Sequence, residues 1–364
     1  MRTKSISKAT LTVIIAGAIA GLAAVILHLL GNPANMGLCI ACFLRDTAGG
    51  LKLHSAGVVQ YVRPEIPGIV LGAFVLSLFK KEFRPRGGSS PVTRFVIGAF
   101  VMIGALAFLG CPFRMVLRMA AGDLNAWIGF AGFVGGVFLG TLFLRNGFSL
   151  RRSEVQRLSE GLIFPIIAIA LLIMVAVGST LLAYSEGGPG SMHAPVLIAF
   201  LIAAVVGVVV QHSRLCQAGG VRDIFLMKDM HLMWGTIAIF VVVLIANLIQ
   251  GTFNLSMTGH AVAHSDTLWN ILGLGLVGFG VTLLGGCPLR QLVLAGTGNT
   301  DSAITVLGML VGAAFSHNFG LAGAPANAES AGGVSANGRY AVLLGFAVLL
   351  VIAFTNLKRK KASA

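Results

Sequence analysis

The sequence predicts an all-α, polytopic membrane protein, and three observations lead to this fold class. Apolar residue types make up 56% of the 364 residues and charged types only 10%, whereas soluble domains carry about 25% charged residues. Twelve acidic and 26 basic side chains cannot cover a soluble core of this size, and a lipid bilayer removes that need. The basic residues also lie in short clusters between apolar runs, as in the loops of membrane proteins. The composition therefore excludes a soluble enzyme, a disordered chain and a nucleic-acid-binding protein.

Ten apolar runs are the predicted helices of this fold. The first run follows three basic residues and is longer than the apolar part of a secretory signal peptide, so we expect a retained first helix. Several runs are shorter than the roughly 20 residues of a straight span, which predicts about nine to ten transmembrane helices together with short re-entrant helices. The runs cover residues 9–30, 66–79, 95–109, 127–143, 162–184, 196–211, 234–247, 268–284, 303–319 and 340–354.

The basic residues predict the orientation of the chain, because Lys and Arg concentrate in cytoplasmic loops. With the amino terminus inside, most of the 26 bases fall in loops on the cytoplasmic side, and the carboxyl terminus is cytoplasmic as well. The base-free stretches 185–193, 251–266 and 321–338 then lie outside. The bases that this orientation leaves outside are Arg45, Lys52, Arg63, Arg114, Arg118 and Arg339.

Two sequence motifs occur twice at nearly the same spacing. An Arg-Asp pair begins six residues after Cys39 and six residues after Cys216, with an offset of 177 residues between the copies. The motif Gly-Cys-Pro-x-Arg around Cys111 recurs around Cys287 with an offset of 176 residues. Because two different motifs agree, the sequence predicts that the chain consists of two homologous halves.

The predicted halves, residues 1–160 and 161–364, have opposite orientations in the membrane. Five predicted spans lie between the Cys39 and Cys216 motifs, and an odd number of spans places equivalent motifs on opposite membrane faces. Inverted repeats are a common architecture of transporters, with the substrate bound near the membrane midplane. We therefore expect a single membrane domain shaped like an hourglass, with two facing funnels.

The Cys-Pro dipeptides predict helix starts that suit an anion. Proline fits the first position of a helix and the preceding cysteine would cap it, which leaves free backbone N–H groups and the positive end of the helix dipole beside the thiol. A guanidinium at membrane depth costs about 2.5 to 3.5 kcal/mol, so the arginines of the motif should face a wet cavity or a partner. Thiols are soft and polarisable, which favours sulfur or selenium over hard oxyanions. The predicted pathway residues are Cys39, Cys111, Cys216, Cys287, Arg114 and Arg290, with Cys39 and Cys216 before glycine-rich turns at the funnel mouths.

Other interpretations of these residues remain open. Cys39 and Cys42 form a C-x-x-C motif that could cycle between thiols and a disulfide, although Cys42 is matched by Gly219 in the repeat. The Arg-Asp pairs are either turn-forming ion pairs or part of the substrate pathway. The secondary candidates are therefore Cys42, Arg45, Asp46, Arg222 and Asp223. The histidines show no ligand spacing, so no metal site and no cofactor are expected.

These motifs resemble those of the YeeE/YedE family of bacterial inner-membrane proteins, which transport sulfur compounds. The segments CIACFLRD at 39–46 and QYVRPEI at 60–66 look most similar to the YedE branch, which is associated with selenium transport. The resemblance implies an hourglass of inverted halves in which cysteines pass thiosulfate along a pore by hydrogen bonds, and it implicates Cys39, Cys111 and Cys287, with Cys216 as the repeat mate. It also implies a cytoplasmic sulfur carrier of the SirA/TusA type as partner. Cys42 and the segment 51–65 depart from the thiosulfate branch.

The resulting prediction is an inner-membrane transporter, not an enzyme, that takes up a selenium- or reduced-sulfur-containing anion. Thiosulfate uptake is one alternative, a membrane thiol-disulfide redox protein is a second, and a generic anion channel is a third. No phosphate-binding loop of the G-x-x-x-x-G-K-[ST] type occurs in the sequence, so the prediction includes no ATP-driven machinery.

Overall fold

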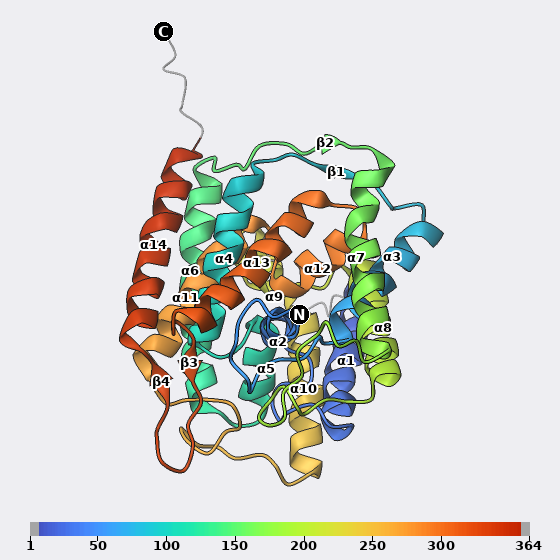
Figure 1. Ribbon diagram of the computed structural model, residues 1–364. Helices are drawn as coiled ribbons and strands as arrows, with labels where there is room; N and C mark the ends of the chain where they lie inside the picture. The colour runs from blue at the N-terminus through green and yellow to red at the C-terminus, as the bar shows by residue number, and fades with distance from the viewer. Residues whose placement is uncertain (1–6, 358–364) are drawn as a thin grey trace.

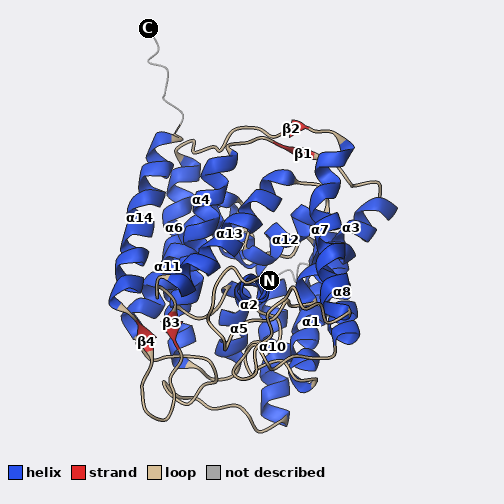
Figure 2. Ribbon diagram, viewed as in Figure 1, coloured by secondary structure: helices blue, strands red, loops and turns tan. Residues whose placement is uncertain are grey.

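The computed structural model describes residues 7–357, and helices account for most of that range (Figure 2). Ten long helices overlap the ten predicted apolar runs, because in lipid a helix satisfies all backbone hydrogen bonds within its own segment. They are α1 (Lys8–Leu29), α3 (Glu65–Phe79), α4 (Pro91–Ala107), α6 (Leu124–Arg145), α7 (Leu158–Ala176), α8 (Val196–Ser213), α10 (Met233–Ile249), α11 (Thr267–Leu284), α13 (Thr300–Asn318) and α14 (Ala336–Thr355). The predicted run 162–184 extends too far, because its helix ends at Ala176 and Gly178 follows with a φ of 64°.

The helices confirm the predicted class, an all-α polytopic membrane protein. Within the described range, seven helical segments are long and apolar enough to cross a membrane. Helices α3 and α10 are apolar but shorter, with 15 and 17 residues. The terminal bases used to predict the orientation, Arg2, Lys4 and the cluster at 358–361, lie outside the described residues.

Four short helices lie in the middle of the bundle, surrounded by the long ones (Figure 1). Helices α5 (Pro112–Ala120) and α12 (Pro288–Gly296) begin at the proline of a Cys-Pro dipeptide, as predicted. Helices α2 (Ile40–Gly50) and α9 (Gln217–Met227) begin directly after Cys39 and Cys216. The glycine-rich turns expected there are absent, because each Cys side chain accepts a backbone N–H from the first helical turn and so caps a helix.

Two small antiparallel pairs of strands lie at opposite ends of the helix bundle (Figure 1). Strand β1 (Arg86–Gly87) pairs with β2 (Glu154–Val155), with Arg86 opposite Val155. Strand β3 (Gly323–Ala324) pairs with β4 (Gly333–Val334), with Gly323 opposite Val334. The first pair joins loops that the charge pattern places in the cytoplasm, and the second joins parts of a loop that it places outside.

Glycines allow two pairs of long helices to approach closely. Helix α6 packs on α11, and α13 packs on α4. A Cβ atom at Gly136 would clash with the carbonyl of Gly275, and a Cβ at Gly312 would clash with the carbonyl of Ala99. Both members of the second contact differ from those of the first by 176 residues, the offset of the Cys-Pro motifs. Close packing through small residues is the usual way in which helices associate in lipid.

Helices α4 and α11 run antiparallel through the centre of the molecule. Gly104 of α4 faces Gly273 of α11, and Gly280 of α11 faces Ile97 of α4. Residue numbers therefore rise along one helix as they fall along the other. Because a cysteine-capped helix follows each of them, α5 and α12 start from opposite ends of this pair.

Helix α7 follows α6 and helix α14 follows α13, yet the two pack differently. Helix α7 covers α3, α12 and α13, whereas α14 lies against α4 and α11 at the far edge of the bundle (Figure 1). The boundary predicted between residues 160 and 161 falls in the first turn of α7.

Candidate functional site

The four repeated cysteines are the N-cap residues of the four short helices. The N-termini of these helices meet in pairs, because Cys39 Sγ lies 4.0 Å from Cys111 Sγ and the backbone N–H of Cys287 donates to Cys216 Sγ over 3.3 Å. All four side chains are buried, and the most exposed, Cys216, is only 5% accessible. The structure therefore brings together the predicted thiols of each half as one pair.

The first cluster consists of Cys39, Cys42, Cys111 and Arg114. Cys39 caps α2 and Cys42 lies in its first turn, and their Sγ atoms lie 2.9 Å apart. All three cysteines are free thiols. The guanidinium of Arg114 donates to Cys42 Sγ over 3.3 Å. Cys42 thus joins the predicted pathway residues, although the second half has Gly219 at the matching position.

Arg114 is completely buried and is held by backbone carbonyls. Its guanidinium donates to the carbonyls of Asn35 over 2.9 Å, Val262 over 3.0 Å and Ala261 over 3.3 Å, and also to that of Leu109. The expectation that it faces a partner rather than lipid is therefore met by four carbonyls. Two of them come from the loop between α10 and α11, which sequence analysis did not connect with this site.

The second cluster consists of Cys216, Gln217, Cys287 and Arg290. The Cys287 thiol donates to Gln217 Oε1 over 3.0 Å, and the Gly219 N–H donates to Cys216 Sγ over 3.3 Å. Arg290 is partly exposed and donates to Gln211 Oε1 over 3.2 Å. Gln217 was not among the predicted residues, and its amide nitrogen is buried without a partner within the described part of the chain. A polar side chain directly after a repeated cysteine was the signal for it.

The Arg-Asp pairs are ion pairs within helices, not turns. Arg45 and Asp46 lie on α2, 2.7 Å apart, and are 3% and 0% exposed. Asp46 also accepts from Arg63, whose Nη2 lies 2.7 Å from Asp46 Oδ2. Arg222 and Asp223 lie on α9, 2.8 Å apart, and are 26% and 11% exposed. The ion pairs of Arg45, Asp46 and Arg63 are therefore buried from solvent, whereas the Arg222–Asp223 pair is more accessible.

A further buried ion pair was missed by sequence analysis, which assigned Arg118 only to an outer loop. Arg118 is on α5, its Nε lies 2.7 Å from Asp123 Oδ2, and both side chains are at most 1% exposed. Its guanidinium also stacks 4.2 Å from the centre of the Phe108 ring. Asp123 in turn caps α6 through the N–H groups of Asn125 and Ala126. This pair fixes the end of α5 opposite Cys111.

The geometry of each cluster suits a soft anion. Two helix N-termini point at the same pair of thiols, so two helix dipoles and their free N–H groups act on one point. An arginine one turn into α5 or α12 adds a full positive charge near it. Sulfur atoms supply weak, polarisable hydrogen-bonding groups in place of hard oxygen ligands. Within residues 7–357, no group of three or more His, Cys, Asp or Glu residues is placed to hold a metal ion.

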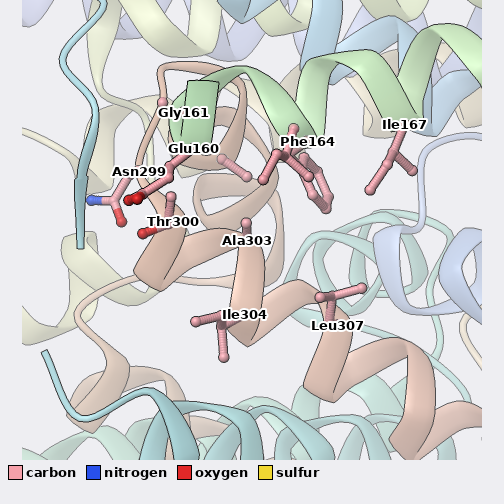
Figure 3. A pocket seen from close by; sticks show the side chains of 12 residues that line it. Glu160, Gly161, Phe164, Ile167, Asn299, Thr300, Ala303, Ile304 and Leu307 are labelled. Carbon is pink, nitrogen blue, oxygen red and sulfur yellow. The ribbon is translucent and has the colours of Figure 1, made fainter. Parts of the chain in front are cut away.

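Two adjoining cavities lie away from both clusters, between α7 and α13. Their volumes are about 160 and 240 Å³, and Phe164, Ile167 and Leu307 line both. Figure 3 shows Phe164 and Ile167 of α7 across from Ile304 and Leu307 of α13, with Glu160 and Thr300 at one end. No candidate cysteine or arginine lines either cavity, so they carry none of the predicted site.

Comparison with known proteins assigns a family to this arrangement. The profile of the Sulphur transport family matches residues 2–139 and 212–363, which is most of the chain. The chain belongs to this family. The match confirms the resemblance found in the sequence, and it contains all four cysteine-capped helices.

One known transporter is similar to part of the chain. The chain is 29% identical over 125 residues to the thiosulfate transporter TsuA of Escherichia coli (strain K12). The matched region is 33% of this chain and 34% of the relative. The chain thus aligns with about a third of the length of that protein.

Proposed function

We propose that this protein transports a sulfur- or selenium-containing anion across the bacterial inner membrane. The observation that carries the proposal is the convergence of two cysteine-capped helix N-termini, with an arginine nearby, in each half of the chain. Membership of the Sulphur transport family and the partial similarity to a thiosulfate transporter support a sulfur-containing anion. When selenium replaces the terminal sulfur of such an anion, the charge is the same and the exposed atom is softer, so the same thiols suit it.

The two halves, 1–160 and 161–364, act in this proposal as inverted repeats around the pathway. The glycine contacts that recur at the 176-residue offset support it, and so does the antiparallel packing of α4 against α11. The first cluster then faces the outside and the second faces the cytoplasm, with both termini cytoplasmic. The bases of the cytoplasmic loops suit an acidic surface on a sulfur carrier of the SirA/TusA type.

Transport in this scheme needs no covalent step. The anion enters at Arg114 and accepts hydrogen bonds from the thiols of Cys111 and Cys39. It then exchanges these donors for Cys287 and Cys216 in the second cluster, near Arg290. Each cluster supplies donors without a negatively charged acceptor beside the thiols, so the anion is attracted but not held tightly.

Uptake measurements in cells that lack other sulfur uptake routes test this function. We expect Cys111→Ala and Cys287→Ala each to reduce uptake of labelled thiosulfate or selenite at least tenfold, with unchanged protein in the membrane. Gly135→Ala is the matched control, because a Cβ at Gly135 meets open space. Normal uptake in both cysteine variants would refute the proposal. Comparison of thiosulfate, selenite and chloride as competitors separates a sulfur transporter, a selenium transporter and a generic anion channel.

A thiol-disulfide redox function is the second candidate, and the 2.9 Å separation of the Cys39 and Cys42 sulfur atoms favours it. A thiol at the N-cap and a thiol in the first turn of a helix can close a disulfide with small movements. Rapid alkylation of free thiols during turnover distinguishes the two functions. A Cys39–Cys42 disulfide that forms and disappears with uptake supports the redox function. Thiols that stay reduced throughout support anion transport without a covalent step.

A further inference from the structure

A large cavity is lined by two residues whose backbone carbonyls bind the buried guanidinium of Arg114. Its volume is about 610 Å³, and it is lined by residues of the loop 258–265 and of the segment 326–331. Ala261 and Val262 line this cavity, and their carbonyls also accept hydrogen bonds from Arg114. One stretch of backbone therefore separates the cavity from the first cluster.

We propose that residues 258–265 form a gate over the first cluster and that the cavity is the vestibule in which the anion is captured. When the gate is closed, Arg114 donates hydrogen bonds to the carbonyls of Ala261 and Val262. When the gate opens, the anion accepts these hydrogen bonds instead. The inference rests on the proposed function, because it assigns the anion to Arg114. It adds a segment from the second half of the chain as the element that controls access.

The exchange of partners at Arg114 favours the anion once the gate moves. A hydrogen bond from a guanidinium to a charged acceptor is roughly twice as strong as one to a neutral carbonyl. The carbonyls of Asn35 and Leu109 do not line the cavity and keep the guanidinium in place during the exchange. Arg114 thus keeps the Asn35 and Leu109 carbonyls and the Cys42 thiol as fixed acceptors, and the two loop carbonyls are the exchangeable ones.

The closed gate combines backbone strain with a small set of restraining hydrogen bonds. Val262 has a φ of 51°, a left-handed conformation that is unfavourable for a β-branched residue and that clusters at clamps and switches. The hydrogen bonds that hold the loop closed include those of His264 Nε2 with the Ala107 carbonyl at 2.7 Å, of the Ala326 N–H with the Ala263 carbonyl at 2.7 Å, and of Asn270 Nδ2 with the His264 carbonyl at 3.2 Å. The strain at Val262 opposes these hydrogen bonds.

The second cluster is covered by the end of a helix and not by a loop. We therefore assign the gate to the first cluster alone. Arg290 donates to the Val210 carbonyl and the Gln211 side chain, both on the last turn of α8. It is partly exposed, whereas Arg114 is 0% exposed. A helix end cannot move as a short loop does, so control of access is assigned to the loop 258–265.

The rate at which an anionic, membrane-impermeant thiosulfonate reagent labels individual cysteines tests the gate. Val262→Asn relieves the left-handed strain, because Asn tolerates this conformation, and should slow labelling of Cys39, Cys42 and Cys111 from outside by roughly fivefold. His264→Ala removes one of the hydrogen bonds that hold the loop closed and should accelerate the same labelling by roughly tenfold. Labelling of Cys216 and Cys287 from the cytoplasmic side of inverted vesicles should stay unchanged in both variants, which also shows that the fold is retained.

Opposite effects of the two variants, confined to the first cluster, support the gate. Unchanged rates, changes in the same direction, or equal changes at both clusters overturn it. Because the readout needs no substrate, its result is independent of the transport assay. If the variants label as expected but the wild type shows no uptake, the proposed function is refuted and the gate is still supported.

Discussion

Arg114 and Arg118 lie one turn apart on α5 and show two ways of burying a guanidinium. Arg114 donates to neutral carbonyls and keeps its full positive charge for the cluster. Arg118 is neutralised by Asp123 at 2.7 Å and packs on Phe108. A helix of nine residues thus carries one arginine that we propose binds the anion and one that forms a buried ion pair.

Removal of the carboxylate beside Arg118 tests its structural role. Asp123→Ala should lower the free energy of unfolding by about 3 to 5 kcal/mol, because it leaves a buried guanidinium without a counter-charge. Asn299→Ala is the matched control, because Asn299 caps α13 as Asp123 caps α6 but forms no ion pair. It should cost only about 1 kcal/mol. Thermal unfolding in detergent measures both, and equal losses would contradict the assignment.

At the scale of elements, the long helices were predictable and the capping of the short ones was predictable only in part. Apolar runs locate the ten long helices because burial in lipid depends on local composition. Proline after Cys111 and Cys287 indicated two short helices, whereas no residue after Cys39 or Cys216 marks a helix start. Their caps depend on a thiol accepting a backbone N–H, a property that the sequence pattern does not reveal.

Some contacts of the site were not predicted for a different reason: the partners lie far apart along the chain. Arg63 reaches Asp46 across 17 residues, and Arg114 reaches the Val262 carbonyl across 148. Motif spacing identifies residues of one element, but it cannot show which loop folds over them. The repeat pointed to the thiols and arginines of each cluster, and only the folded chain showed the carbonyls around Arg114.

Adjacent glycines on α6 provide a test of helix packing. Gly136→Ala should destabilise the protein by about 1 to 3 kcal/mol, because the new Cβ would collide with the Gly275 carbonyl on α11. Gly135→Ala should be neutral or stabilising by up to about 1 kcal/mol, because its Cβ meets open space and alanine favours a helix. The folded fraction after heating, measured by size-exclusion chromatography, compares the two. Similar behaviour of both variants would contradict the packing.

At the scale of the whole molecule, the two strand pairs mark opposite ends of the bundle, and their sides of the membrane can be tested. Val155 of β2 is 93% exposed, and Ser330 is an exposed residue of the loop between β3 and β4. The five native cysteines are all buried, so their background labelling is slow. We expect Ser330→Cys to react with an impermeant maleimide in intact spheroplasts and Val155→Cys only after permeabilisation. Reaction of both from one side would refute the predicted orientation.

The antiparallel crossing of α4 and α11 has a mechanical consequence. The backbones of α4 and α11 are in contact where Gly104 faces Gly273. The two helices can therefore tilt about this contact more easily than they can slide or separate. When a helix tilts about a contact, residues near the contact move least and residues far from it move most. Gly104 lies in the last turn of α4, close to Cys111, whereas Gly273 lies in the first half of α11, far from Cys287. A tilt about this contact therefore displaces the Cys287 thiol much more than the Cys111 thiol.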